Sequence, residues 1–258
     1  MTSPLYRPEI KIRRARRKLG ELEGACGKFF QENTPVLVFD TDTQPGHKLA
    51  KIRLDASLPE DVHVITGEII YHLRSSLDQI AVAFGRMSAA QPNVKNIYFP
   101  TGDNLTGFNA DVASKLAGVD ADLVQEIVGL KPYDGGDDTL RAIFRMANVD
   151  KHLELIPAST AGHLAGMNDF TIRGAWTAFI IGGMESLKDG VIISDLFPEG
   201  TITPNNPDAK IRIAGDILLG NVSIYNGEQL LPFLDRLVTK GEEVYGHLAG
   251  FCRRTSRI

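Results

Sequence analysis

Polar side chains with the chemistry of a catalytic site recur along the segment from residue 139 to residue 155. At about 100° per residue they share one side of a predicted helix, away from its apolar stripe. They are Arg141, Arg145, Asn148 and His152. Arginine and asparagine can bind an anion or stabilise developing negative charge, and histidine can transfer a proton near neutral pH. The pattern is typical either of half an active site or of a solvated helix end.

A second polar cluster lies on the segment HLRSSLDQ. Arg74 and Asp78 are four residues apart beside an apolar stripe, and His72 lies on the other flank of that stripe. An ion pair of this spacing stabilises a helix by only a few tenths of a kcal/mol. A structural role therefore competes with substrate binding for this cluster.

Apolar spacing predicts the helices that must position these clusters. The strongest pattern runs from residue 60 to residue 87, where the apolar residues step by three or four and form one stripe. The same spacing predicts four further helices, over residues 7–32, 120–129, 139–155 and the stretch after Asn226. Asp138 or Thr139 can cap the helix that begins near residue 139. Turn residues between 88 and 110 indicate that the chain loosens there.

Period-two alternation predicts strands in two parts of the chain. Two short strands are expected near residue 40, on the stretches TPVLVFD and KLAKIRL. Four more are expected after residue 159, on FTIRGAWTAFII, GVIISDLF, KIRIAGDILL and NVSIYN. Since they follow one another with turns between them, they predict one antiparallel sheet of about four strands.

The predicted fold class is therefore α+β. Residues 1–158 form a helical module with long amphipathic helices and two short strands. Residues 159–258 form the antiparallel sheet and a closing C-terminal helix. No long linker separates the two parts, so we expect them to pack as one unit.

The composition is that of an ordinary soluble globular protein, with 258 residues, 43% hydrophobic and 23% charged. The first 20 residues lack the apolar core of a signal peptide, and no apolar run is long enough to predict a membrane span. Two cysteines, Cys26 and Cys252, are too few for a disulfide framework or a cysteine-based metal site. We therefore expect a reducing, cytoplasmic setting. Nucleotide-loop, zinc-protease and serine-hydrolase motifs are missing, so neither a metal nor a cofactor is predicted.

The charge is unevenly distributed along the chain. The formal net charge is −4, yet residues 7–18 hold seven of the 28 Lys and Arg residues, and the C-terminal tail adds more. Such clusters can bind phosphates, so this first helix is a candidate contact with RNA, although charge runs more often form a solvated helix face.

The two clusters together resemble a pattern in uncharacterised bacterial and phage proteins. Those proteins carry a helix of the type LRSxLD and a later N-x-D-K-H run, here LRSSLD and NVDKH. The resemblance covers about residues 60–156 and implies no particular activity.

A second, looser resemblance is to the HEPN superfamily of all-helical ribonucleases and nucleotide-binding domains, many of them in toxin–antitoxin and antiphage systems. Their signature is an Arg followed, after roughly four to six residues, by a His. Arg145 and His152 are separated by six residues. Two features depart from the family: Met146 follows the arginine where a polar residue is usual, and a sheet is an addition to that fold.

The HEPN resemblance implies metal-independent RNA cleavage by a homodimer. His152 would act as general acid or base, Arg145 would stabilise the charged phosphorane, and Asn148 would orient the histidine or the phosphate. Substrate-binding residues would be Arg141, Lys151, Arg74, Asp78 and His72. The alternative is a non-catalytic helical interaction protein, in which LRSSLD and NVDKH form a structural polar network.

Overall fold

The computed structural model of the chain describes residues 3–34, 36–41, 48–54, 56–152, 158–168, 170–172, 191–192, 202–204, 210–220, 225 and 227–258. The chain divides into two compact units, and each unit combines segments that are far apart in the sequence. The first unit comprises Met1–Leu22, Val64–Ile156 and Leu231–Ile258, and the second comprises Glu23–His63 and Pro157–Leu230. The first unit thus joins residues from the two ends of the chain.

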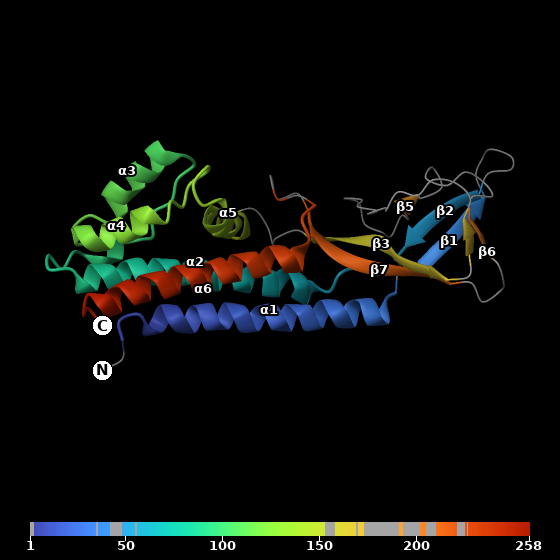
Figure 1. Cartoon of the computed structure of the whole chain (residues 1–258), viewed down its shortest axis with the longest axis horizontal. Helices are drawn as coiled ribbons and strands as arrows, with labels where there is room; N and C mark the ends of the chain where they lie inside the picture. Colours follow the sequence, from blue (N-terminus) through green and yellow to red (C-terminus); the bar gives the residue numbers. More distant parts are fainter. Residues whose placement is uncertain are drawn as a thin grey trace. The chain divides into compact units, whose positions relative to one another are not determined.

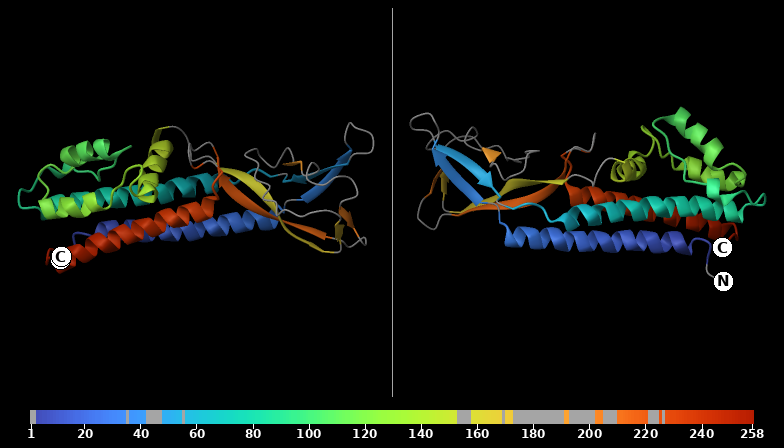
Figure 2. Two further views of the ribbon diagram at one scale, coloured as in Figure 1. Left: turned by 45° about the horizontal axis from the view of Figure 1, so that its top comes forward. Right: turned by 180° about the vertical axis from the view of Figure 1, so that it is seen from behind.

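Three long helices, α1 (Tyr6–Glu32), α2 (Glu60–Met87) and α6 (Leu230–Arg254), run side by side in the first unit (Figures 1 and 2). Each buries the apolar stripe that its spacing predicts. The stripe of α2 is buried at Ile69, Leu73, Leu77, Ile80 and Phe84. Burying each such side chain contributes about 1.5–3 kcal/mol, so these stripes dominate the stability of the bundle.

Small and charged residues fix how α6 meets its neighbours. A methyl group on Gly241 would lie 2.8 Å from Cδ2 of Leu73, so the glycine allows α6 to approach α2 closely. Arg16 on α1 donates from Nε to Glu242 at 3.0 Å and from Nη2 to Thr239 at 3.0 Å. These contacts tie the first helix to the last.

Three shorter helices complete the first unit: α3 (Leu105–Lys115), α4 (Ala121–Gly129) and α5 (Asp138–His152). α3 was not predicted; its N-cap Asn104 accepts a hydrogen bond from the Gly107 amide at 2.9 Å. The cap of α5 is Asp137, which accepts from the Leu140 amide at 2.8 Å, so the expected cap at Asp138 or Thr139 is displaced by one or two residues. Among the described residues, no helix is both long and apolar enough to cross a membrane.

The second unit contains short antiparallel ladders. One ladder joins β1 (Val36–Thr41), β2 (Lys48–Arg53) and β5 (Val191–Ile192). Another pairs β3 (Ala158–Asn168) with β7 (Lys210–Leu219), and the third pairs β4 (Phe170–Ile172) with β6 (Ile202–Pro204). β1 and β2 occupy the two stretches expected as strands near residue 40.

The predicted fold class, with one antiparallel sheet of about four strands, is wrong. The structure is mostly helical, and its described strands after residue 157 do not form a four-stranded sheet. Alternation shows that a stretch is extended but not which strand it pairs with. β3 pairs with β7 and β4 pairs with β6, so these strands do not follow the order of the expected meander. β3 also lies on ASTAGHLAGMN, a small-residue stretch without alternation. Most of the expected strands FTIRGAWTAFII, GVIISDLF and NVSIYN lie outside the described residues.

Candidate functional site

A pocket of about 390 Å³ lies in the first unit between α2 and the C-terminal turn of α5. We call it the α2–α5 pocket. Its lining residues are Tyr71, Arg74, Ser75, Asp78, Gln79 and Val82 from α2, the segment 94–98 without Asn96, and Ala147, Asp150 and Lys151 from α5. The volume is within the range of about 300–1,000 Å³ that is typical of small-molecule sites. The segments LRSSLD and NVDKH therefore meet at one pocket.

Helical spacing explains why these side chains converge. The pocket residues of α2 recur at steps of three and four, on a face beside the stripe that packs into the bundle. Ile97 and Phe99 are buried and hold the third wall in place. The amide of Phe99 donates to the Asp78 carboxylate at 3.0 Å, which ties this wall to α2.

Arg74 and Asp78 form a desolvated ion pair on the pocket wall. Nη2 of Arg74 lies 3.0 Å from Oδ1 of Asp78, and the guanidinium carbon lies 4.2 Å from the centre of the Phe144 ring. Burial raises the pKa of Asp78 and lowers the pKa of Arg74, so desolvation outweighs their mutual attraction. Nη1 of Arg74 is buried and has no hydrogen-bond partner in the described part of the chain.

Asp150 supplies a second carboxylate from α5. A methyl group on Gly67 of α2 would lie 2.6 Å from its Oδ1, so the aspartate lies directly against α2 where no side chain intervenes. Burial raises the pKa of Asp150. Within the described ranges, no hydrogen bond or ion pair is found for this carboxylate. Its oxygens are not among the buried unpaired atoms of the described residues, so the carboxylate is open to water or to a ligand.

The mouth of the pocket is cationic and aromatic. Lys95 and Lys151 are exposed, and the exposed fractions of Tyr71 and Tyr98 are 53% and 47%. Large aromatic side chains this exposed at a pocket rim are common where a ligand or partner is bound.

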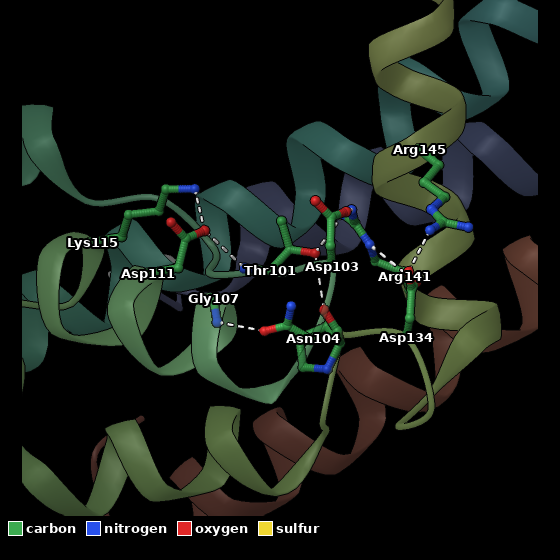
Figure 3. A network of polar contacts seen from close by, with 10 residues as sticks. Thr101, Asp103, Asn104, Gly107, Asp111, Lys115, Asp134, Arg141 and Arg145 are labelled. Atoms are coloured by element: carbon green, nitrogen blue, oxygen red, sulfur yellow. Dashed lines mark hydrogen bonds and ion pairs between the residues drawn. The ribbon is translucent and has the colours of Figure 1, made fainter.

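The arginines of α5 lie on another side of the helix and belong to a polar network (Figure 3). Arg141 is only 7% exposed; it forms an ion pair with Asp103 and donates to Oγ1 of Thr101 at 3.0 Å. Arg145 forms an ion pair with Asp134, and Arg141 lies 3.6 Å from the same aspartate. The network fastens α5 to the loops on either side of α3 and α4.

The eight residues expected at a catalytic or substrate site are therefore not gathered in one place. Arg74, Asp78 and Lys151 line the α2–α5 pocket, and Arg141 and Arg145 belong to the network. Asn148 is exposed on the network side of α5. His152 is the last residue of α5, and its side chain lies outside the described residues. His72 does not line the pocket; burial lowers its pKa, and Lys11 and Arg14 lower it further.

Several pocket residues were missed as site residues: Tyr71, Gln79, Lys95, Tyr98 and Asp150. Asp150 is part of the NVDKH segment, so its motif position was a usable signal. The tyrosines and Lys95 carry no pattern of their own, since only the fold brings the segment 94–98 against α2.

Metal binding has no candidate within the residues that the structure describes, because they contain no group of three His, Cys, Asp or Glu placed to hold an ion. Asp137 and Asp138 instead accept backbone amides around the start of α5. Comparisons with protein-family models, curated proteins and solved structures each found no match. Function must therefore be argued from the pocket and the network themselves.

Proposed function

We propose that this chain is a non-catalytic binding protein whose α2–α5 pocket holds a small molecule. The observation that carries the proposal is a pocket of ligand size whose lining combines charges of both signs with apolar side chains. Arg74, Lys151 and Asp150 supply the charges, and Val82, Val94 and Ile97 supply the apolar surface. A few polar groups placed among apolar side chains are typical of small-molecule sites.

The network around α5 supports a binding role over catalysis. Arg141 and Arg145 are each engaged by aspartates, so their charge is already neutralised by the protein. A guanidinium held in this way positions a helix, whereas stabilisation of a reacting phosphate needs one that faces the substrate. This network joins Arg141 and Arg145 to Thr101, Asp103 and Asp134, so it differs from the network of LRSSLD and NVDKH that the sequence suggests for a non-catalytic protein.

The proposal is tested by two-dimensional amide NMR of the full chain against a mixed library of small anions, cations, zwitterions and apolar fragments. Binders should shift amides of residues 71–82 and 94–98. Val82→Trp, which fills the pocket, should abolish the shifts. Lys131→Ala, at an exposed lysine that does not line the pocket, should leave them intact. No binder from any class, or binding unchanged by Val82→Trp, would overturn the proposal.

We propose metal-independent RNA cleavage as a second candidate, because one observation favours it. Arg145 keeps a 30% exposed side chain, and Asn148 on the same side of α5 is exposed, so this side of the helix reaches solvent. A ribonuclease site requires that access, together with a proton-transferring group, for which His152 is the candidate.

RNA cleavage in EDTA by the wild type, Asn148→Ala and His152→Ala tests this candidate. Loss of cleavage by about 10²-fold or more in His152→Ala, at an unchanged thermal midpoint, is expected of a general acid or base. Lys131→Ala is the matched surface control. Absence of cleavage by the wild type would remove the candidate and leave the binding proposal unaffected.

A further inference from the structure

The α2–α5 pocket has a polar end and an apolar end. Asp150 lies against Gly67, one turn before Tyr71, which places its carboxylate at the N-terminal end of the α2 wall. Val82 is at the other end, where the opposing wall supplies Val94 and Ile97. From position 71 to position 82, an α-helix rises by roughly 16 Å. A ligand that fills the pocket is therefore amphipathic along its length.

The polar end carries charges of both signs. Arg74 lines this end and forms an ion pair with Asp78, with Nη2 3.0 Å from Oδ1. Lys151 adds a second cation, and Asp150 presents a carboxylate for which the described residues offer no donor. The protein therefore presents one acceptor for a cation and donors for an anion at the same end.

We propose, resting on the proposed binding function, that the ligand is a zwitterion with a large apolar side chain, that is, an α-amino acid or a short peptide. Its ammonium group pairs with Asp150, its carboxylate lies beside Arg74 and Lys151, and its side chain lies among Val82, Val94 and Ile97.

Other ligand classes satisfy the pocket less well. A simple anion would face the unpaired Asp150, and a simple cation would face the donors of Arg74 and Lys151. Like charges brought together out of water are disfavoured. A purely apolar ligand would bury the same polar atoms without partners. Only a ligand that carries both charges beside an apolar group leaves none of them unpaired.

The test is a calorimetric titration of the full chain with a matched ligand series. The probes are L-phenylalanine, N-acetyl-L-phenylalanine, L-phenylalaninamide, L-alanine and the dipeptide Phe-Leu. N-acetylation removes the cation and amidation removes the anion, so each should weaken binding about tenfold or more. Alanine should bind more weakly than phenylalanine because it leaves the apolar end empty. The dipeptide distinguishes a site for free amino acids from a site for peptides. A free amino-acid site should bind it more weakly than phenylalanine, and a peptide site should bind it more tightly.

A variant then assigns the ammonium contact. Asp150→Asn keeps the shape of the side chain and removes its charge. It should therefore weaken the binding of phenylalanine about tenfold or more and leave the affinity for the N-acetyl compound unchanged. Glu23→Gln, at an exposed carboxylate of α1 outside the pocket, should not alter the ratio of the two affinities. A thermal midpoint for each variant verifies that it is folded.

The outcomes separate the two proposals. Two results would overturn the proposal of a zwitterionic ligand. One is equal affinity for phenylalanine and its N-acetyl form, and the other is a ratio of these two affinities that Asp150→Asn leaves unchanged. If other library compounds still bind in a way that Val82→Trp blocks, the pocket stands and only the ligand class is wrong. If no compound of any class binds, both proposals are wrong.

Discussion

The two arginines of α5 differ in how deeply they are buried and therefore in how much they contribute to stability. Arg141 and Arg145 were grouped by sequence as equivalent anion-binding residues, yet one is almost fully buried and the other is 30% exposed. Solvent screens the ion pair of Arg145, whereas the guanidinium of Arg141 is itself shielded from water and depends on its protein partners. Their substitution should therefore have different consequences.

Arg141→Met should lower the free energy of unfolding by about 1–3 kcal/mol, because it removes the partners of Thr101 and Asp103 at a buried site. Arg145→Met should lower it by only about 0.2–1 kcal/mol. Urea denaturation of both variants measures the difference. Equal losses would mean that burial does not distinguish the two arginines.

Asp150 should make stability depend on pH. Burial raises its folded pKa above the ordinary value of 3.8, so the folded chain binds the proton more tightly than the unfolded chain. This contribution to stability is fully present below the unfolded pKa and is lost as pH rises through the folded pKa. Asparagine cannot ionise, so Asp150→Asn should gain stability relative to wild type as pH increases from 3 to 7.

Urea denaturation of Asp150→Asn and wild type at several pH values measures this gain. Glu23→Gln, at an exposed carboxylate, serves as the control variant. A difference between Asp150→Asn and wild type that stays constant over the whole range would show that the carboxylate is not desolvated.

At the scale of elements, the helices were predictable and the contacts between them were not. The stripe over residues 60–87 gave α2 its correct bounds, because burial of one helix face imposes a period that sequence reveals directly. α3 has a weaker apolar pattern, with Phe108 as its buried residue, and it was missed. The pocket depends on the segment 94–98 lying against α2, a contact between elements that no local pattern encodes.

Two of the three glycines of α6, Gly241 and Gly246, offer a matched test of helix packing. Gly241→Ala should lower the free energy of unfolding by about 1–3 kcal/mol, because the new methyl group would meet Leu73 of α2. Gly246 has no atom within 4 Å of an added methyl group. Gly246→Ala should therefore raise the free energy by about 0.5–1 kcal/mol through helix propensity. Urea denaturation that ranks the two variants in the opposite order would contradict the close approach of α6 and α2.

At the scale of the whole molecule, neither compact unit is a continuous piece of chain. The apolar stripes of α1, α2 and α6 are buried in the same unit, although α6 comes from the far end of the chain. A stripe predicts that a helix is covered on one side, but it does not identify the covering element.

A chain truncated after residue 158 should therefore lose cooperative unfolding and bind hydrophobic dyes. Loss of α6 exposes Leu73, which is buried and lies against Gly241 of α6. Addition of a separate chain with residues 225–258 should restore a cooperative transition by circular dichroism. Cooperative folding of the truncated chain alone would show that α6 is not required.

The tie between α1 and α6 also has a consequence for biosynthesis. The partners of Arg16, Thr239 and Glu242, are synthesised more than 200 residues after it. At about 5–20 residues per second, that interval is roughly 10–45 s. Throughout it, the nascent helices lack their final covering surface. Production of this protein should therefore depend on holdase chaperones that shield the early helices until the last one emerges.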